Sequence, residues 1–214
     1  MADGKFDAQS RSQMVETTLD LLDVVSTENE VSQRGLAERL GVALGLTNAV
    51  LKRCVRKGLL KVRQAPARRY AYYLTPKGFK EKSRLTAEYL YTSLTFYRDA
   101  RQDFDDLLAY CANRGWRRVA LVGVSELSEI ATLAAIGRET EVVGILDGGR
   151  NETTSCGLRI FRTFAECQAE GSPDIFILTT ITDPQAAFDS LAAEIPHGLI
   201  LTPKALRISR LGGA

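Results

Sequence analysis

The fold is decided by one stretch of the chain, SQRGLAERLGVALGLTNAVLKRCVRKG, which covers residues 32–58. Ser32 is of the residue type that caps helix N-termini, and Gly41 is of the type that ends helices in a left-handed conformation. A short helix is therefore expected between these residues, and a further helix follows at once and ends at Gly58. That further helix has its apolar side chains on one face (Leu51, Cys54 and Val55) and Leu46, Ala49, Lys52, Arg53 and Arg56 on the other.

The segments on either side of this stretch predict a helix before it and a β-hairpin after it. Residues 12–26 carry apolar side chains at helical spacing and predict a preceding helix. Two short runs rich in β-forming residues, 60–63 and 69–74, are separated by Gln-Ala-Pro-Ala-Arg, which predicts a hairpin with a basic tip. Helix, short helix, turn, helix and hairpin is the order of a winged helix-turn-helix. In that motif the third helix enters the major groove of DNA and the wing reaches the flanking backbone.

Charge is distributed unevenly along the chain. Residues 52–84 hold twelve Lys or Arg and a single acid, Glu81, which is a net charge of +11. Because the whole chain carries +2, the remaining residues sum to −9. Such asymmetry indicates that one segment meets a polyanion while the rest does not, and double-stranded DNA is the partner that the predicted motif implies.

The expected DNA contacts lie on the third helix, at the turn before it and at the hairpin tip. Asn48 and Arg53 have side chains that read base edges with paired hydrogen bonds. The other basic residues of the set are expected to contact phosphates. The complete set is Ser32, Gln33, Gly45, Leu46, Thr47, Asn48, Ala49, Lys52, Arg53, Arg56, Lys57, Arg68 and Arg69.

A long helix is expected from Pro76 to about Asn113. Large side chains recur along it at intervals of seven, namely Leu90, Tyr97, Phe104 and Cys111. A second copy of the chain is the natural cover for such a stripe, so a homodimer through the helix of residues 76–114 is expected. The alternative is a helix that packs back on its own chain.

Beyond Gly115 the periodicity changes from helical to alternating β and α. Five apolar runs suit buried parallel strands: 118–123, 142–147, 158–161, 174–179 and 198–202. Helical stretches lie between several of them: 126–136, 164–170 and 184–194. This alternation predicts a small doubly wound sheet with helices on its faces.

The ends of these strands supply candidate ligand contacts, because open α/β sheets bind ligands where their parallel strands end. Only Gly123 matches the glycine pattern of a dinucleotide-binding loop, and Glu126 stands where a phosphate would be repelled, so standard NAD binding is not expected. Asp147 fits a ribose-binding acid and a turn former equally well. The expected ligand contacts are Gly123, Ser125, Asp147, Thr179 and Thr182. The hydroxyl groups of the serine and the two threonines could bind a sugar or a phosphate, or they could cap helices.

Several classes of function find no support in the sequence. The four cysteines share no ligand spacing and the chain has one histidine, so no metal site is expected. We expect Cys54 in the core and the other thiols partly exposed. No combination of residues indicates catalysis, so the chain is not expected to be an enzyme. With neither a secretory signal nor a membrane-spanning run, a cytoplasmic location is expected.

Residues 32–42, 44–48, 57–62 and 73–86 resemble the MarR-type regulators associated with exopolysaccharide gene clusters. The last of these stretches, YLTPKGFKEKSRLT, is the most specific. The resemblance implies regulation of transcription near polysaccharide or cell-surface genes.

The second half of the chain is similar to small Rossmann-like domains found beside sugar-nucleotide enzymes, in the segments VGILDGG (143–149) and GLRIF (157–161). The two-domain order is also similar to the Rex family of NAD(H)-sensing repressors, but the missing glycines depart from its pattern. The resemblance implies a sensor of a small effector, a sugar nucleotide or other nucleotide, ahead of an NAD(H) sensor. A ligand-free interaction scaffold and a sugar-nucleotide-related enzyme are the remaining alternatives.

We therefore expect an α/β chain with an N-terminal winged helix-turn-helix, a long linker helix and a small Rossmann-like doubly wound parallel sheet. The expected domain bounds are 1–75, 76–114 and 115–214.

Overall fold

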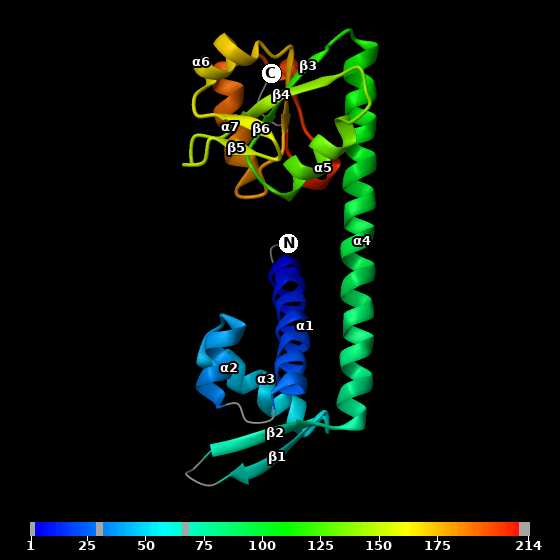
Figure 1. Ribbon diagram of the computed structural model, residues 1–214, viewed down its shortest axis with the longest axis vertical. Helices are drawn as coiled ribbons and strands as arrows, with labels where there is room; N and C mark the ends of the chain where they lie inside the picture. The colour runs from blue at the N-terminus through cyan, green and yellow to red at the C-terminus, as the bar shows by residue number, and fades with distance from the viewer. Residues whose placement is uncertain (1–2, 29–31, 66–68, 210–214) are drawn as a thin grey trace. The chain divides into compact units, whose positions relative to one another are not determined.

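The computed structural model describes residues 3–28, 32–65 and 69–209 (Figure 1). It divides into two compact units, Met1–Ser93 and Leu94–Ala214. Helix α4 (Pro76–Asn113) runs through the boundary and contributes its first half to one unit and its second half to the other.

The first unit has the predicted order of elements. Helix α1 spans Asp3–Thr27, α2 spans Gln33–Leu40 and α3 spans Leu44–Arg56. Strands β1 (Leu60–Ala65) and β2 (Arg69–Leu74) pair antiparallel, with Leu60 opposite Leu74 and Ala65 opposite Arg69. The first half of α4 completes the unit. A winged helix-turn-helix is therefore present at the N-terminal end (Figure 1).

Local rules explain where α2 begins and ends. The Ser32 hydroxyl oxygen accepts a hydrogen bond from the Gly35 amide at 3.1 Å. Gly41 adopts a left-handed conformation with φ of 61°, which favours glycine, and its amide bonds back to the helix. The turn between α2 and α3 is thus fixed by the two residues that the sequence marks as helix boundaries.

One apolar core holds the first unit together. It joins side chains from all three N-terminal helices to the hairpin and to α4, and a single side chain, Leu85, carries the α4 contact. The buried members are Leu21, Leu22, Val25, Leu36, Val50, Leu51, Cys54, Leu59, Leu60, Tyr72 and Leu85. Burial of these side chains fixes which face of α3 remains toward solvent.

The second unit is built on a mostly parallel sheet of six strands in the order β5-β6-β4-β3-β7-β8. The strands are β3 (Arg118–Val122), β4 (Glu141–Leu146), β5 (Thr154–Ser155), β6 (Leu158–Phe161), β7 (Ile175–Leu178) and β8 (Ile200–Leu201). Only β5 runs antiparallel to its neighbour. Because β3 lies next to both β4 and β7, the chain leaves β3 toward one side of the sheet and later returns to its other side.

Helices cover both faces of this sheet (Figure 1). The second half of α4 and α5 (Glu126–Ala135) enclose one core, which contains Leu121 and Ile177. Helix α7 (Pro184–Glu194) and a π-helical turn (Cys167–Gly171) enclose the other. The shorter helices are α6 (Phe164–Glu166) and two 3-10 turns, His197–Leu199 and Lys204–Leu206.

The structure corrects the expected stripe on α4. Leu90 is 53% exposed and Tyr97 is 38% exposed, whereas Phe104 and Cys111 are completely buried in the core of the second unit. The stripe is therefore covered along its second half by the chain's own sheet and helices. Only the first half remains for a partner.

Cysteine burial also differs from expectation. Cys54 is buried as predicted, but Cys111 and Cys167 are buried too, and only Cys156 is exposed. Burial raises the pKa of each of the three enclosed thiols to about 11.

Candidate nucleic-acid interface

Helix α3 has one buried face and one exposed face. Val50, Leu51 and Cys54 point into the core, with exposed fractions of 3% or less. Residues toward solvent include Gly45, Ala49, Lys52, Arg53 and Arg56, with Lys57 directly after the helix. Leu46 is half-buried and packs against the core. The face that the sequence assigns to DNA is thus largely the face that the fold leaves open.

Two of the expected DNA contacts on α3, Thr47 and Asn48, are not fully exposed. Thr47 is completely buried, and its hydroxyl donates a hydrogen bond to the Ala43 carbonyl at 3.3 Å. The Thr47 side chain is therefore not part of the exposed face of α3, and its contact with DNA stays a prediction from the sequence. Asn48 is half-buried, and its Oδ1 is enclosed without a hydrogen-bond partner among the described residues. A paired hydrogen bond to a base edge needs both ends of the amide, so Arg53 is the better placed base reader.

Ser32 and Gln33 have structural contacts at the start of α2. Ser32 caps the helix, and the Gln33 amide nitrogen donates to the Tyr72 hydroxyl at 3.1 Å. This hydrogen bond ties the start of α2 to the hairpin. Of the two residues expected at the hairpin tip, Arg68 lies outside the described residues, and Arg69 is described only in its backbone, at the start of β2.

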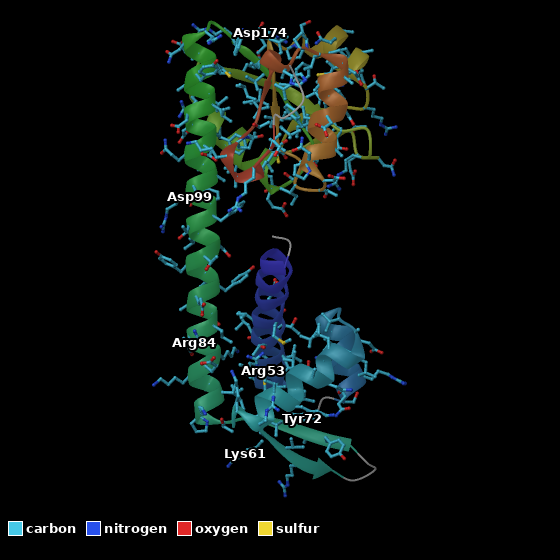
Figure 2. The ribbon with its side chains drawn as sticks, turned by 180° about the vertical axis from the view of Figure 1, so that it is seen from behind. Arg53, Lys61, Tyr72, Arg84, Asp99 and Asp174 are labelled. Carbon is cyan, nitrogen blue, oxygen red and sulfur yellow. The ribbon has the colours of Figure 1, made fainter. Side chains whose placement is uncertain are left out.

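Basic side chains of the first unit fall into two groups. Those of α3 and of β1 form no ion pair with any described residue: Lys52, Arg53, Arg56, Lys57, Lys61 and Arg63. Figure 2 shows Arg53 on α3 and Lys61 on the hairpin, with Arg84 farther along on α4.

Acidic partners neutralise Lys82 and Arg84 on α4, whereas the exposed Lys77 and Lys80 of the same helix form no ion pair with a described residue. Lys82 lies 2.6 Å from an Asp23 carboxylate oxygen and also donates to the Ser26 hydroxyl. Arg84 donates to Glu81 and Glu88, and its hydrogen bonds lower the pKa of Glu81. The positive charge available to a polyanion therefore lies on α3, on the hairpin and at the start of α4.

The expected ligand contacts of the second unit meet at the edge where its parallel strands end, which we call the carboxyl edge. Three of them, Gly123, Ser125 and Thr179, are already joined by hydrogen bonds, and Asp147 is bonded to the intervening Val124. Asp147 accepts from the Val124 amide at 2.9 Å, next to Gly123. Ser125 donates to the Thr179 carbonyl at 2.5 Å, and the Thr179 hydroxyl, which is buried, lies 2.6 Å from the Gly123 carbonyl.

The fifth expected contact, Thr182, is exposed, and its carbonyl accepts from Thr180. Two residues that the sequence did not single out complete the edge. The Arg150 guanidinium lies 3.9 Å from Asp147 and donates to the Val124 carbonyl at 3.4 Å. Thr180 packs directly on Gly123. An arginine after an Asp-Gly-Gly turn is the one sequence signal that pointed to Arg150.

Within the described residues, no group of His, Cys, Asp or Glu side chains could hold a metal ion. No helix in the same part of the chain is long and apolar enough to cross a membrane.

Residues 14–61 match the winged helix-turn-helix DNA-binding family. Parts of the chain are similar to MepR, a transcription regulator of the Staphylococcus aureus multidrug efflux pump MepA, at 17% identity over 45% of this chain and 82% of that one, with a TM-score of 0.34. The PcaV transcriptional regulator from Streptomyces coelicolor, solved with its natural ligand, is 23% identical over 51% of this chain and 89% of that one, with a TM-score of 0.38.

The multiple antibiotic-resistance repressor MarR from Listeria monocytogenes is 18% identical over 44% of this chain and 70% of that one, with a TM-score of 0.32. Each of these three similarities covers about half of the chain. No curated protein matches the chain.

Proposed function

We propose that the chain is a DNA-binding regulator of transcription, in which α3 enters the major groove and the β1-β2 hairpin contacts the flanking backbone. The carrying observation is the set of unpaired basic side chains on the exposed face of α3 and on β1. Unpaired cations release counterions when they meet phosphates, which is the main electrostatic drive for binding DNA.

Arg53 is the proposed base reader because it is exposed, unpaired and on the outward face of α3. Its guanidinium can donate two parallel hydrogen bonds to a guanine edge. Lys52, Arg56 and Lys57 are proposed to contact phosphates, together with Lys61 and Arg63 of the hairpin. Gly45 and Ala49, which lack bulky side chains, leave room for close approach of the helix to the groove.

The test is fluorescence anisotropy with duplexes from the chain's own promoter region, across a range of salt concentrations. We expect Arg56→Ala to weaken binding to all duplexes and to lower the salt slope by about 0.9. Arg53→Ala is expected to weaken the preferred duplex more than a random one. Arg84→Ala is the matched control, because this arginine is already paired with Glu81 and Glu88.

Two outcomes would refute the proposal. One is an affinity of the unmodified chain that hardly changes with salt, since several phosphate contacts require a steep dependence. The other is an equal loss in Arg84→Ala and Arg56→Ala, because the unpaired charges would then have no special role.

We further propose that two copies associate through the exposed part of α4. Large apolar side chains gather there that the described part of the chain leaves exposed: Tyr89, Leu90, Tyr91, Leu94, Phe96 and Tyr97, all 38% exposed or more. Exposed apolar surface of this kind marks a site of association. A dimer would present two α3 helices to a palindromic operator with half-sites about 34 Å apart.

The sheet of the second unit supports a Rossmann-like interpretation. Counted along the chain, its parallel strands lie in the order 3-2-1-4-5, the order of the first five strands of doubly wound dinucleotide-binding folds. Control of polysaccharide genes, a cytoplasmic location and a small effector stay predictions from the sequence. An effector screen by thermal shift tests the last of these.

A further inference from the structure

We infer that the loop between β3 and α5 binds no nucleotide phosphate, because a carbonyl, a carboxylate and a hydroxyl group of the protein already accept hydrogen bonds from its Gly123, Val124 and Ser125 amides. This inference concerns the second unit and does not depend on the proposed binding of DNA by the first.

A doubly wound sheet places a nucleotide phosphate at one location, the N-terminus of the helix that follows its first strand. Here that location is the loop from Gly123 to Glu126, between β3 and α5. A phosphate held there needs free amide groups that point toward it and a glycine without a neighbour above it. Both requirements can be checked atom by atom.

The amides of Gly123, Val124 and Ser125 in this loop, and that of Leu127 in the first turn of α5, are engaged within the protein. Gly123 donates to the Leu146 carbonyl at 2.9 Å, and Val124 donates to an Asp147 carboxylate oxygen at 2.9 Å. Ser125 donates to the Ser128 hydroxyl at 3.1 Å, and the Leu127 amide donates to the Ser125 hydroxyl at 3.1 Å. The capping pair of Ser125 and Ser128 thus performs at α5 what a bound phosphate performs in a dinucleotide-binding loop.

The space above Gly123 is also filled. Its φ of 95° is in the region that favours glycine, and a Cβ built there would lie 2.4 Å from the Thr180 Cβ and 2.8 Å from its Cα. This glycine therefore accommodates the close approach of the Thr180 backbone. In a dinucleotide-binding loop the same absence of a side chain admits the pyrophosphate.

Negative charge around the loop also disfavours a bound phosphate. The second Asp147 oxygen accepts from the Gly149 amide at 3.0 Å, and Arg150 lies beside this carboxylate. Glu126 and Glu129 add negative charge in the first turn of α5. A phosphate would have to displace one carboxylate and approach two more. Asp147 acts as a built-in anion that joins the ends of β3 and β4, so sugar nucleotides and NAD(H) are not ligands of this loop.

The experiment measures melting temperatures of the complete chain with pyrophosphate, ADP, NAD⁺, NADH and UDP-glucose, each at millimolar concentration. We expect no saturable shift with any of them. Asp147→Ala is expected to melt several degrees lower, and formate, which can occupy the position of the missing carboxylate, is expected to restore part of the loss where chloride at equal ionic strength does not.

Asp189→Ala is the matched control, because this exposed carboxylate of α7 bonds only to the Gln185 side chain among the described residues. It is expected to melt like the unmodified chain with and without formate. If Asp147→Ala proves insoluble, Asp147→Asn takes its place, since it keeps an acceptor for Val124 but loses the charge and places an NH2 group against the Gly149 amide. A saturable shift in the melting of the second unit, followed by the fluorescence of Trp116, with any of the five phosphate compounds overturns the inference, as does an Asp147 variant that melts normally.

Discussion

Replacing Phe104 and Leu90 one at a time separates the two halves of α4. Phe104 is completely buried in the core shared by α4, α5 and the sheet, whereas Leu90, about four turns earlier, is 53% exposed. Removing a buried Phe side chain lowers the free energy of unfolding by about 3–5 kcal/mol. Because domains are stable by only about 5–15 kcal/mol, Phe104→Ala removes a large fraction of the stability of the second unit.

The assay combines urea denaturation with sedimentation equilibrium. Trp116 is the only tryptophan and packs against the core of the second unit, so its fluorescence reports the unfolding of that unit. We expect Phe104→Ala to unfold at much lower urea concentration and still to sediment as a dimer. Leu90→Glu is expected to keep its Trp116 transition and to sediment as a monomer, while Ala109→Glu, at an exposed position of α4 outside the proposed dimer surface, is the control that stays dimeric.

The reverse pattern would refute the division of α4. If Phe104→Ala unfolded like the unmodified chain and became a monomer, the whole stripe would face a partner. If Leu90→Glu remained a dimer at the lowest concentrations, the association would lie elsewhere.

Three further predictions concern single features. Ser32→Ala should lower stability by about 1 kcal/mol, because it removes the cap of α2; an unchanged circular dichroism melt would contradict this. Thr47→Val should leave DNA affinity within about twofold, because that side chain is buried; a loss as large as that of Arg53→Ala would show that the side chain reaches DNA after all. The three buried thiols, with pKa values raised from 9.0 to about 11, stabilise the fold below pH 9, and this contribution is lost as the pH rises toward 11. Urea midpoints that stay constant over that interval would exclude the effect.

Local signals predicted much of the first unit. Ser32 and Gly41 marked the ends of α2, and the apolar spacing marked the buried face of α3, because caps and helical periodicity act over a few residues. The strands of the second unit were likewise evident as apolar runs, except for β5, which has two residues and no periodicity to detect.

Long-range contacts account for what the sequence did not predict. Periodicity along α4 identified a stripe of large side chains but not which of them the chain's own core covers, so Phe104 and Leu90 received the same interpretation. The charge count over residues 52–84 treated Lys82 as unpaired, because its partner Asp23 lies far outside that segment of the sequence. Asp147 had two equal interpretations because its bond to Val124 joins the ends of two strands that only the folded sheet brings together.

The buried cysteines give this chain a set of internal reporters. Cys54 lies in the core of the first unit, Cys111 in the core on one face of the sheet and Cys167 in the core on the other face. A thiol enclosed in this way reacts with an alkylating reagent only when its own core opens, so the labelling rate of each cysteine measures a local opening free energy. Mass spectrometry of peptides after a labelling pulse would therefore resolve whether the two faces of the sheet open together or separately, and whether DNA slows the opening of the first unit alone, without any engineered probe.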